Sequence, residues 1–162
     1  FGGSHFWGML KADGTEIWDI ELAGGCDYVP NAFDIDKDGE IEILILCRDT
    51  DAEGLKVIDS HGVEEWRYVG PGVHAGGMWL QPTICDIDND GEWDILLGSP
   101  DEEGSGLPTG AMHCLNWYGQ VKWRYDLPAD QSEGKYIRCQ AAVGDVNKDG
   151  FLEVAFQAGS PG

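Results

Sequence analysis

Three mostly apolar runs stand out along this chain, because each follows directly on a cluster of acidic residues. The runs "EIEILIL", "EWDILLG" and "FLEVAFQ" begin at residues 40, 92 and 151, and they are apolar at most positions. Strands with one solvated face alternate cleanly between apolar and polar residues, whereas strands buried on both faces do not. We therefore predict three central strands, each packed between neighbouring sheets.

A second pattern places a tryptophan four residues after a glycine. The segments "DGTEIW", "HGVEEW" and "YGQVKW" contain the pairs Gly14/Trp18, Gly62/Trp66 and Gly119/Trp123. A strand-like segment precedes each glycine: "FWGMLKA", "LKVIDS" and "AMHCLNW". Each unit therefore predicts a hairpin with glycine in its turn and the tryptophan at a packing position.

The two patterns interleave and form a repeat. The acidic clusters begin at Asp34, Asp86 and Asp145, which are 52 and then 59 residues apart. Repeats of this length, with four strands and no helical periodicity, are typical of β-propeller blades. We predict an all-β fold of four-stranded antiparallel blades in a single domain, residues 1–162, with repeats at about 1–48, 49–104 and 105–162.

The phase of the repeat predicts two intact blades, at about residues 31–68 and 82–127, with half a blade at each end. The chain begins nearly inside a strand, so we expect a processed or excised product. Propellers have about 4–8 blades, and three interpretations are open. The chain is a piece of a longer propeller, or its end halves close a very small ring, or the halves of successive copies join head-to-tail into a ring or filament.

The acidic clusters have the composition of metal-binding loops. Acids at alternate positions direct successive carboxylates inward, and a glycine at position 6 permits a sharp turn. Positions 1, 3, 5, 7 and 9 hold Asp34, Asp36, Asp38, Glu40 and Glu42 in the first loop, Asp86, Asp88, Asp90, Glu92 and Asp94 in the second, and Asp145, Asn147, Asp149, Phe151 and Glu153 in the third. Phe151 can offer only its backbone carbonyl.

These oxygen ligands predict Ca²⁺, which takes 6–8 oxygens, more readily than Mg²⁺, which retains several waters. An EF-hand needs a glutamate at position 12, but Ile45, Leu97 and Phe156 stand there. The closing acid is therefore at position 9, and each loop joins two strands. We expect about three calcium ions, and a fold that depends on them because they bind only the folded state.

The strongly negative net charge favours the binding of cations and argues against nucleic acids and anionic membranes as partners. Thirty acidic residues against ten basic ones give a formal net charge of -20, which three divalent ions would reduce to about -14. Nucleic acids and anionic membrane surfaces require clustered Lys and Arg, so neither is expected as a partner. No apolar run is long enough for a membrane span of roughly 20 residues.

The remaining candidates for chemistry are weaker. The five cysteines are Cys26, Cys47, Cys85, Cys114 and Cys139; they lack CxxC spacing and leave disulfides and single buried thiols open. The glycine-rich segment 70–79 is either a connecting loop or a sugar-binding loop. Four tryptophans outside the repeat phase are candidates for contacts outside the core: Trp7, Trp79, Trp93 and Trp117. We identify no catalytic triad and no catalytic residue.

The loop "DIDNDGEWDILLG" resembles the FG-GAP/VCBS repeats of calcium-binding β-propellers, as in integrin α subunits. The longer stretch "LKADGTEIWDIEL…NAFDIDKDGEIEILI" is similar to rhamnogalacturonan lyases, which are calcium-containing propellers. The resemblance covers about residues 5–160. It implies that the loop acids at positions 1, 3, 5 and 9 are calcium ligands.

The sequence is compatible with two functions. The first is an extracellular, cell-surface or secreted calcium-binding repeat protein with a structural, adhesive or self-assembling role, whose partners are copies of itself or the rest of a longer propeller. The alternative is a fragment or relative of a polysaccharide lyase, or a carbohydrate-binding propeller, with a groove lined by tryptophan and histidine.

Overall fold

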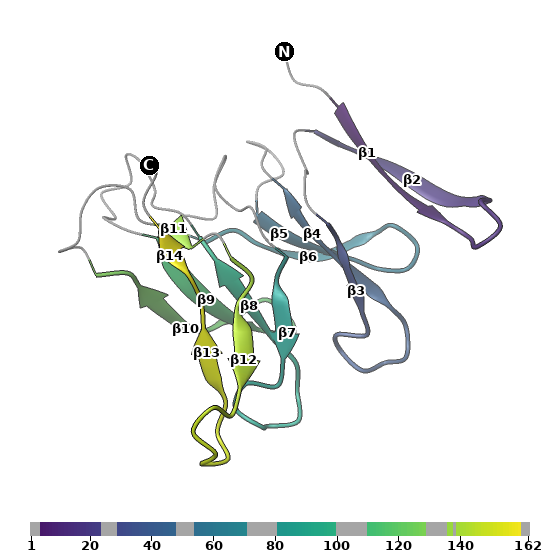
Figure 1. Ribbon diagram of the computed structural model, residues 1–162. Coiled ribbons are helices and arrows are strands. Elements are labelled where there is room, and N and C mark those ends of the chain that lie inside the picture. Colours follow the sequence, from purple (N-terminus) through teal and green to yellow (C-terminus); the bar gives the residue numbers. More distant parts are fainter. Residues whose placement is uncertain are drawn as a thin grey trace.

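The computed structural model describes residues 4–23, 29–47, 54–70, 81–99, 110–128, 136–137 and 139–159. These residues form strands and turns without a helix, so the prediction of an all-β fold is confirmed for them (Figure 1). No helix that could cross a membrane occurs in this part of the chain.

Two four-stranded antiparallel sheets form the centre of the molecule. Sheet one contains β3 (Asn31–Phe33), β4 (Glu42–Cys47), β5 (Gly54–Ile58) and β6 (Glu64–Tyr68); sheet two contains β7 (Thr83–Cys85), β8 (Asp94–Gly98), β9 (Ala111–Asn116) and β10 (Val121–Asp126). In both sheets the strands pair in chain order. The predicted arrangement of two strands around an acidic loop followed by a hairpin is therefore confirmed.

Half-sheets flank this pair of sheets. The N-terminal hairpin consists of β1 (Ser4–Leu10) and β2 (Glu16–Ala23), and the C-terminal pair consists of β12 (Ala142–Gly144) and β13 (Glu153–Ala155). A short ladder joins β11 (Tyr136–Ile137) to β14 (Ala158–Gly159). Figure 1 shows the purple N-terminal hairpin at one end of the molecule, away from the yellow-green C-terminal pair.

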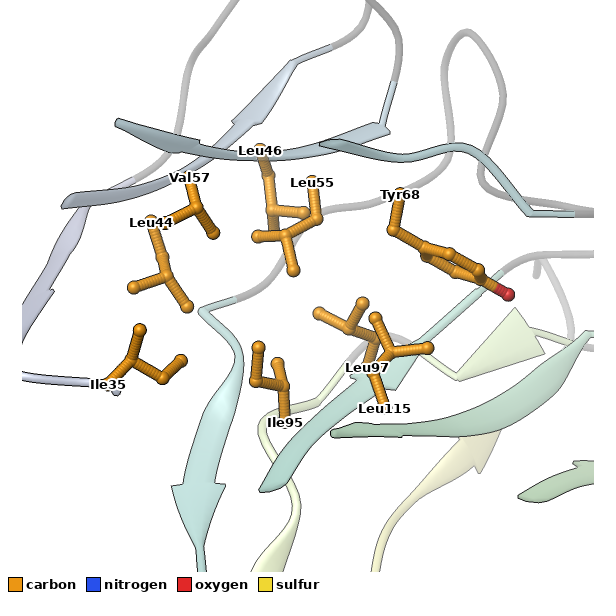
Figure 2. Close-up of a cluster of buried hydrophobic side chains, with 9 residues drawn as sticks. All are labelled: Ile35, Leu44, Leu46, Leu55, Val57, Tyr68, Ile95, Leu97 and Leu115. Atoms are coloured by element: carbon orange, nitrogen blue, oxygen red, sulfur yellow. The ribbon is translucent and has the colours of Figure 1, made fainter. Parts of the chain in front are cut away.

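Sheet faces packed against one another make the core. Side chains of β4, β5 and β6 point toward those of β8 and β9, and Ile35 joins them from the first acidic loop (Figure 2). The opposite face of sheet one, which includes Ile45 and Ile58, packs against Trp18 and other residues of the N-terminal hairpin. Every residue of β4 and β8 is buried, which confirms that these runs are covered on both faces.

The third predicted central strand, β13, differs because it is only partly buried. One face of the C-terminal pair packs on sheet two through Val143 and Val154. Val146 stands at the loop position of buried Ile35 but is 76% exposed, because no further sheet covers it in the described part of the chain. The third run therefore forms the predicted strand, but the burial of that strand depends on a neighbouring sheet.

A tryptophan-on-glycine contact links successive hairpins. Gly14, Gly62 and Gly119 all have positive φ, between 82° and 85°. A Cβ added to Gly62 would lie 3.1 Å from the ring of Trp18, and one added to Gly119 would lie 2.7 Å from the ring of Trp66. Gly62 and Gly119 are therefore required for two reasons. The turn has a positive φ, and the tryptophan ring that covers the turn leaves no room for a side chain.

Sheets one and two also share a buried polar contact that the sequence did not predict. Tyr68 Oη lies 3.0 Å from Nδ1 of His113, and His113 Nε2 lies 3.0 Å from Oγ of Ser99. His113 is completely buried, and burial lowers its pKa to about 4. The imidazole is therefore neutral at physiological pH and satisfied at both nitrogens.

Substituting Gly119→Ala should destabilise the fold more than Gly14→Ala. Both changes place a side chain at positive φ, at a cost of roughly 1–2 kcal/mol. Only Gly119→Ala also collides with Trp66, which adds roughly 1–3 kcal/mol of overpacking, since nothing lies within 4 Å of the Gly14 position. Chemical denaturation of the two variants measures the difference, and equal losses would show that the ring contact contributes nothing.

Stability should fall as pH decreases from 6.5 toward 4, because the unfolded chain then protonates His113 while the folded state does not. A shift of the His113 pKa from 6.5 in the unfolded chain to about 4 in the folded state corresponds to a loss of roughly 2 kcal/mol between pH 7 and pH 5. Urea denaturation of the wild type and of His113→Gln at both pH values tests this. A pH-dependent loss of the same size in His113→Gln would assign the effect to the carboxylates instead.

Candidate metal centre

The three acidic loops share one backbone conformation. Each connects two adjacent antiparallel strands, and the strand registers correspond: Asn31 faces Leu44, Thr83 faces Leu96, and Ala142 faces Ala155. Positions 4 and 6 both have positive φ, at Lys37 and Gly39 in loop one, Asn89 and Gly91 in loop two, and Lys148 and Gly150 in loop three. The turn that directs the carboxylates inward is thus the same in all three.

Backbone N–H groups hold the first and last acids of every loop. In loop one, the N–H of Gly39 donates to Asp34 Oδ2 at 3.2 Å and the N–H of Ile35 donates to Glu42 Oε2 at 2.9 Å. The same pairs recur as Gly91–Asp86 at 3.0 Å, Ile87–Asp94 at 3.2 Å, Gly150–Asp145 at 3.0 Å and Val146–Glu153 at 2.8 Å. One oxygen of each of these carboxylates is fixed in this way. The other oxygen of Asp86 and of Asp145 accepts the N–H of the position 5 residue, at 3.0 and 3.1 Å, whereas in loop one that N–H, of Asp38, donates to Asp36 Oδ1 at 3.1 Å.

Loop one gathers three carboxylates, and no cation of the described residues forms an ion pair with them. Oxygens of Asp34, Asp36 and Glu42 lie within 4.8 Å of one another. At that separation two unit charges repel by roughly 3 kcal/mol at an effective dielectric constant near 20. Asp34 Oδ1 is buried and has no hydrogen-bond partner. A buried, unpartnered carboxylate oxygen is costly unless a cation meets it.

Other groups increase the negative potential at loop one. Burial raises the pKa of Glu42, and the charges of Asp36 and Glu65 raise it further. Burial likewise raises the pKa of Glu65, which projects from β6, and the charges of Asp36 and Asp59 add to the effect. Lys37 belongs to the same loop, but its ammonium lies over the ring of Trp93, 5.0 Å from the ring centre.

Loop two contains a cation from the protein itself. Oxygens of Asp86, Asp88 and Asp90 lie within 4.8 Å of one another. The ammonium of Lys122, on β10, lies 2.7 Å from Asp88 Oδ2, 3.5 Å from Asp90 Oδ2, and 2.9 and 3.0 Å from the two oxygens of the buried Asp94. Asp94 Oδ1 accepts no well-directed hydrogen bond, but the ammonium is within ion-pair distance of it.

The Lys122 ammonium stays protonated in this position. Burial alone would lower its pKa, but hydrogen bonds to Asp88 and Asp94 outweigh that effect and raise it. The same contact lowers the pKa of Asp88. Lys122 is therefore a permanent positive charge at the place where a metal ion would sit.

Sequence reasoning missed Lys122 because it lies far along the chain from the loop that it contacts. The signal was present in the hairpin pattern, since Ile17, Glu65 and Lys122 each precede the repeated tryptophan. Glu65 and Lys122 both face the acidic loop of their own sheet, so this one position adds a negative charge to loop one and a positive charge to loop two.

Loop three uses an amide to balance its acids. Asn147 Nδ2 donates to Asp149 Oδ2 at 3.0 Å and to Glu153 Oε1 at 2.9 Å, while the N–H of Asp149 donates to Asn147 Oδ1 at 2.8 Å. A donor group thus occupies the space between the two carboxylates. To bind a cation, this amide would have to rotate away.

The residues at position 7 contribute little through their side chains. Glu40, Glu92 and Phe151 are exposed, and the backbone N–H of each donates to the position 5 aspartate at 2.7, 2.7 and 2.9 Å. Glu40 also accepts a hydrogen bond of 3.2 Å from Ser60 Oγ in the adjacent hairpin turn. Their backbone carbonyls are the groups that remain available to a cation.

The alternative site residues are occupied elsewhere or lie outside the described residues. Trp7, Trp93 and Trp117 pack against the hydrophobic clusters, so their interpretation as contacts outside the core was wrong. Trp79, His74 and the rest of segment 71–80 lie outside the described residues, as does Cys26. Burial raises the pKa of Cys85 to about 11 and that of Cys114 to about 12, so both thiols are protonated at neutral pH.

No protein-family model and no curated protein matches this chain. Among solved structures, the chain is similar to the crystal structure of the V. cholerae biofilm matrix protein Bap1, with a TM-score of 0.45 and 16% sequence identity. The match covers 88% of this chain and 26% of that one, so the chain spans about a quarter of that protein. The function of the chain is therefore inferred from the geometry of the loops.

Replacing Lys122 with methionine should convert loop two into a stronger calcium site. The change removes the ammonium and leaves Asp88 and the buried Asp94 uncompensated, so stability without calcium should fall while the calcium-induced rise in Tm grows. The matched control is Arg124→Met on the same strand, which removes the cation paired with Asp126 and leaves the contacts of Lys122 with loop two in place. Thermal melts with calcium and with EGTA test both variants, and identical shifts would rule out competition between Lys122 and the ion.

Proposed function

We propose that this chain is an extracellular, calcium-binding repeat protein of the β-propeller type in which the bound ions have a structural role. The observation that carries the proposal is Asp34 Oδ1, a buried carboxylate oxygen that lies beside Asp36 and Glu42 and has neither a hydrogen-bond partner nor a balancing cation among the described residues. A hard divalent ion satisfies that oxygen and removes the repulsion together.

Calcium fits the donors better than other common metals. The ligands that the loops offer are carboxylate, amide and carbonyl oxygens, which hard cations prefer over zinc or copper. Loop one is the strongest of the three sites, because its carboxylates are uncompensated and Glu65 adds negative potential. Loop two binds more weakly because the ion has to displace Lys122, and loop three because Asn147 has to rotate.

The ions would brace the junctions between strands and would not act on a substrate. Each loop joins the first and second strands of its unit, and its position 9 acid is the first residue of the second strand. Ile35 of loop one reaches into the core between the two sheets. An ion that fixes the loop therefore also fixes the sheet contact, and this role matches the resemblance to FG-GAP/VCBS repeats.

An extracellular location follows from the same chemistry. Calcium-binding modules outside cells work at dissociation constants of about 10⁻⁴–10⁻³ M, where the ion is abundant, and structural sites with partly exposed ligands suit that range. The excess of 20 negative charges then serves both ion binding and solubility. In this setting the chain would act through contacts with other copies of itself or with further repeats.

Calcium should stabilise the fold, and Asp34 should account for the largest part of the effect. At a hundred times the dissociation constant, one site contributes about 2.7 kcal/mol, or roughly 5–10 °C in Tm for a chain of this size. Isothermal titration calorimetry and thermal melts of the wild type, Asp34→Asn and the control Asp19→Asn measure this. Asp34→Asn should lose the tightest site, while Asp19→Asn, which changes an exposed acid on β2, should resemble the wild type.

A Tm that does not change between calcium and EGTA would overturn the proposed function. Equal calcium binding by Asp34→Asn and Asp19→Asn would show that loop one is not the site.

A further inference from the structure

The structure has an open apolar groove on the outer face of sheet two. Its volume is about 410 Å³, and Met112, Trp123, Tyr125, Val154 and Phe156 line it. The first three residues come from β9 and β10 of sheet two, and the last two come from β13 and the residue after it. The groove therefore lies where sheet two meets the incomplete C-terminal pair.

An unpaired strand edge borders this groove. In sheets one and two, the second strand pairs on both sides: β4 lies between β3 and β5, and β8 lies between β7 and β9. Among the described residues, β13 pairs only with β12, so its other edge offers free backbone N–H and C=O groups. An edge of this kind accepts an added strand.

The N-terminal hairpin corresponds to the two strands that the C-terminal pair lacks among the described residues. It contains the third and fourth strands of a repeat, and β1 pairs only with β2 in the described chain. Leu10 stands four residues before its turn glycine, as Ile58 and Leu115 do in the two complete sheets. Ile58 and Leu115 are 2% and 0% exposed because they pack on the preceding unit, whereas Leu10 is 62% exposed.

The tryptophan ladder is open at the same two places. Trp18 covers Gly62 and Trp66 covers Gly119, so the next ring in the series is Trp123, which lines the groove. The first glycine of the series, Gly14, has nothing within 4 Å. One end thus has a ring that covers no hairpin glycine within the described chain, and the other end has a glycine without a ring.

We propose that the N-terminal hairpin of a second copy docks in this groove and completes the C-terminal pair as a four-stranded sheet. β1 of that copy pairs antiparallel with β13, with Leu10 opposite Val154, as Ile58 lies opposite Ile43 and Leu115 opposite Ile95. The turn at Gly14 then lies against Trp123. The contact continues the packing between successive units that the single chain already contains.

The docked copy also covers the far face of the C-terminal pair. Its hairpin carries its own sheet one along, because Trp18 and neighbouring residues hold the two together. That sheet follows the completed sheet as the next unit in the row. Val146, which is 76% exposed in the single chain, is then covered by a following sheet, as Ile35 is covered by sheet two.

Because the two contacting surfaces differ, the association is head-to-tail and can continue from copy to copy into a ring or filament. The inference deepens the structural role proposed above, and its failure can be told apart from a failure of calcium binding. A chain that binds calcium but stays monomeric overturns only the docking, and a chain that assembles without binding calcium overturns only the metal role.

The test uses two variants that each block one surface. Leu10→Lys disables the hairpin and leaves the groove intact, while Tyr125→Lys disables the groove and leaves the hairpin intact; both side chains are substantially exposed in the single chain. The control is Val63→Lys in the β5–β6 turn, a residue that is 60% exposed and belongs neither to the groove nor to the N-terminal hairpin. Sedimentation velocity over a concentration series in calcium measures assembly, and circular dichroism confirms that each variant is folded.

The wild type and Val63→Lys should assemble, and each blocking variant should weaken association at least about tenfold, because a buried apolar contact is replaced by a charge. A mixture of Leu10→Lys and Tyr125→Lys should form dimers and nothing larger, since one good hairpin then meets one good groove. A wild type that stays monomeric at every concentration, or a mixture that does not recover dimers, would overturn the proposal. If further repeats of a longer chain fill the groove in place of a second copy, that chain stays monomeric at every concentration.

Discussion

Burial of each central strand on both faces is the constraint on which the rest of the structure depends. β4 and β8 have no exposed residue, and neither could remain folded in water without a sheet on each side. A unit of this kind is stable only in a row, where every sheet supplies half of the core of the next. The partly buried β13 keeps the sequence pattern of a central strand, although the described residues supply a neighbouring sheet on one face only.

The acidic loops show that one backbone can support three different charge balances. The positive φ values and the hydrogen bond from the position 6 N–H to the position 1 acid recur in each loop, so this part of the turn is common to all three charge balances. Loop one leaves an oxygen unsatisfied, loop two has an ammonium and loop three has an amide. If the loops bind ions as proposed, a residue outside the loop would set the affinity of loop two without changing the loop itself.

Much of the fold could be predicted from the sequence because its signals are local. Glycine at a turn and tryptophan four residues later report on one hairpin, and acids at alternate positions followed by an apolar run report on one loop and strand. The β3–β4 and β7–β8 pairs and both following hairpins were found in this way. The partial burial of β13 could not be found, because it depends on which neighbour is present and not on the composition of the strand.

The parts of the site that sequence reasoning missed are contacts between distant segments. Lys122 enters loop two from β10, and His113 of β9 bonds Tyr68 across two sheets. Neither residue type is unusual for a strand, and no spacing marks the contact. Three loops that looked equivalent as calcium ligands therefore differ in the structure, and only the three-dimensional arrangement separates them.

Metal binding and sheet packing are physically coupled through the alternation of the loop residues. In loop one, the carboxylates at positions 1, 3 and 9 come together, while Ile35 at position 2 points into the core between sheets one and two. Ile87 makes the corresponding contact beyond sheet two, and Val146 is the same residue at the open end. An ion at any loop would therefore order the apolar side chain at position 2. At loop three, where Val146 is exposed, an ion would prepare the surface that the proposed second copy covers.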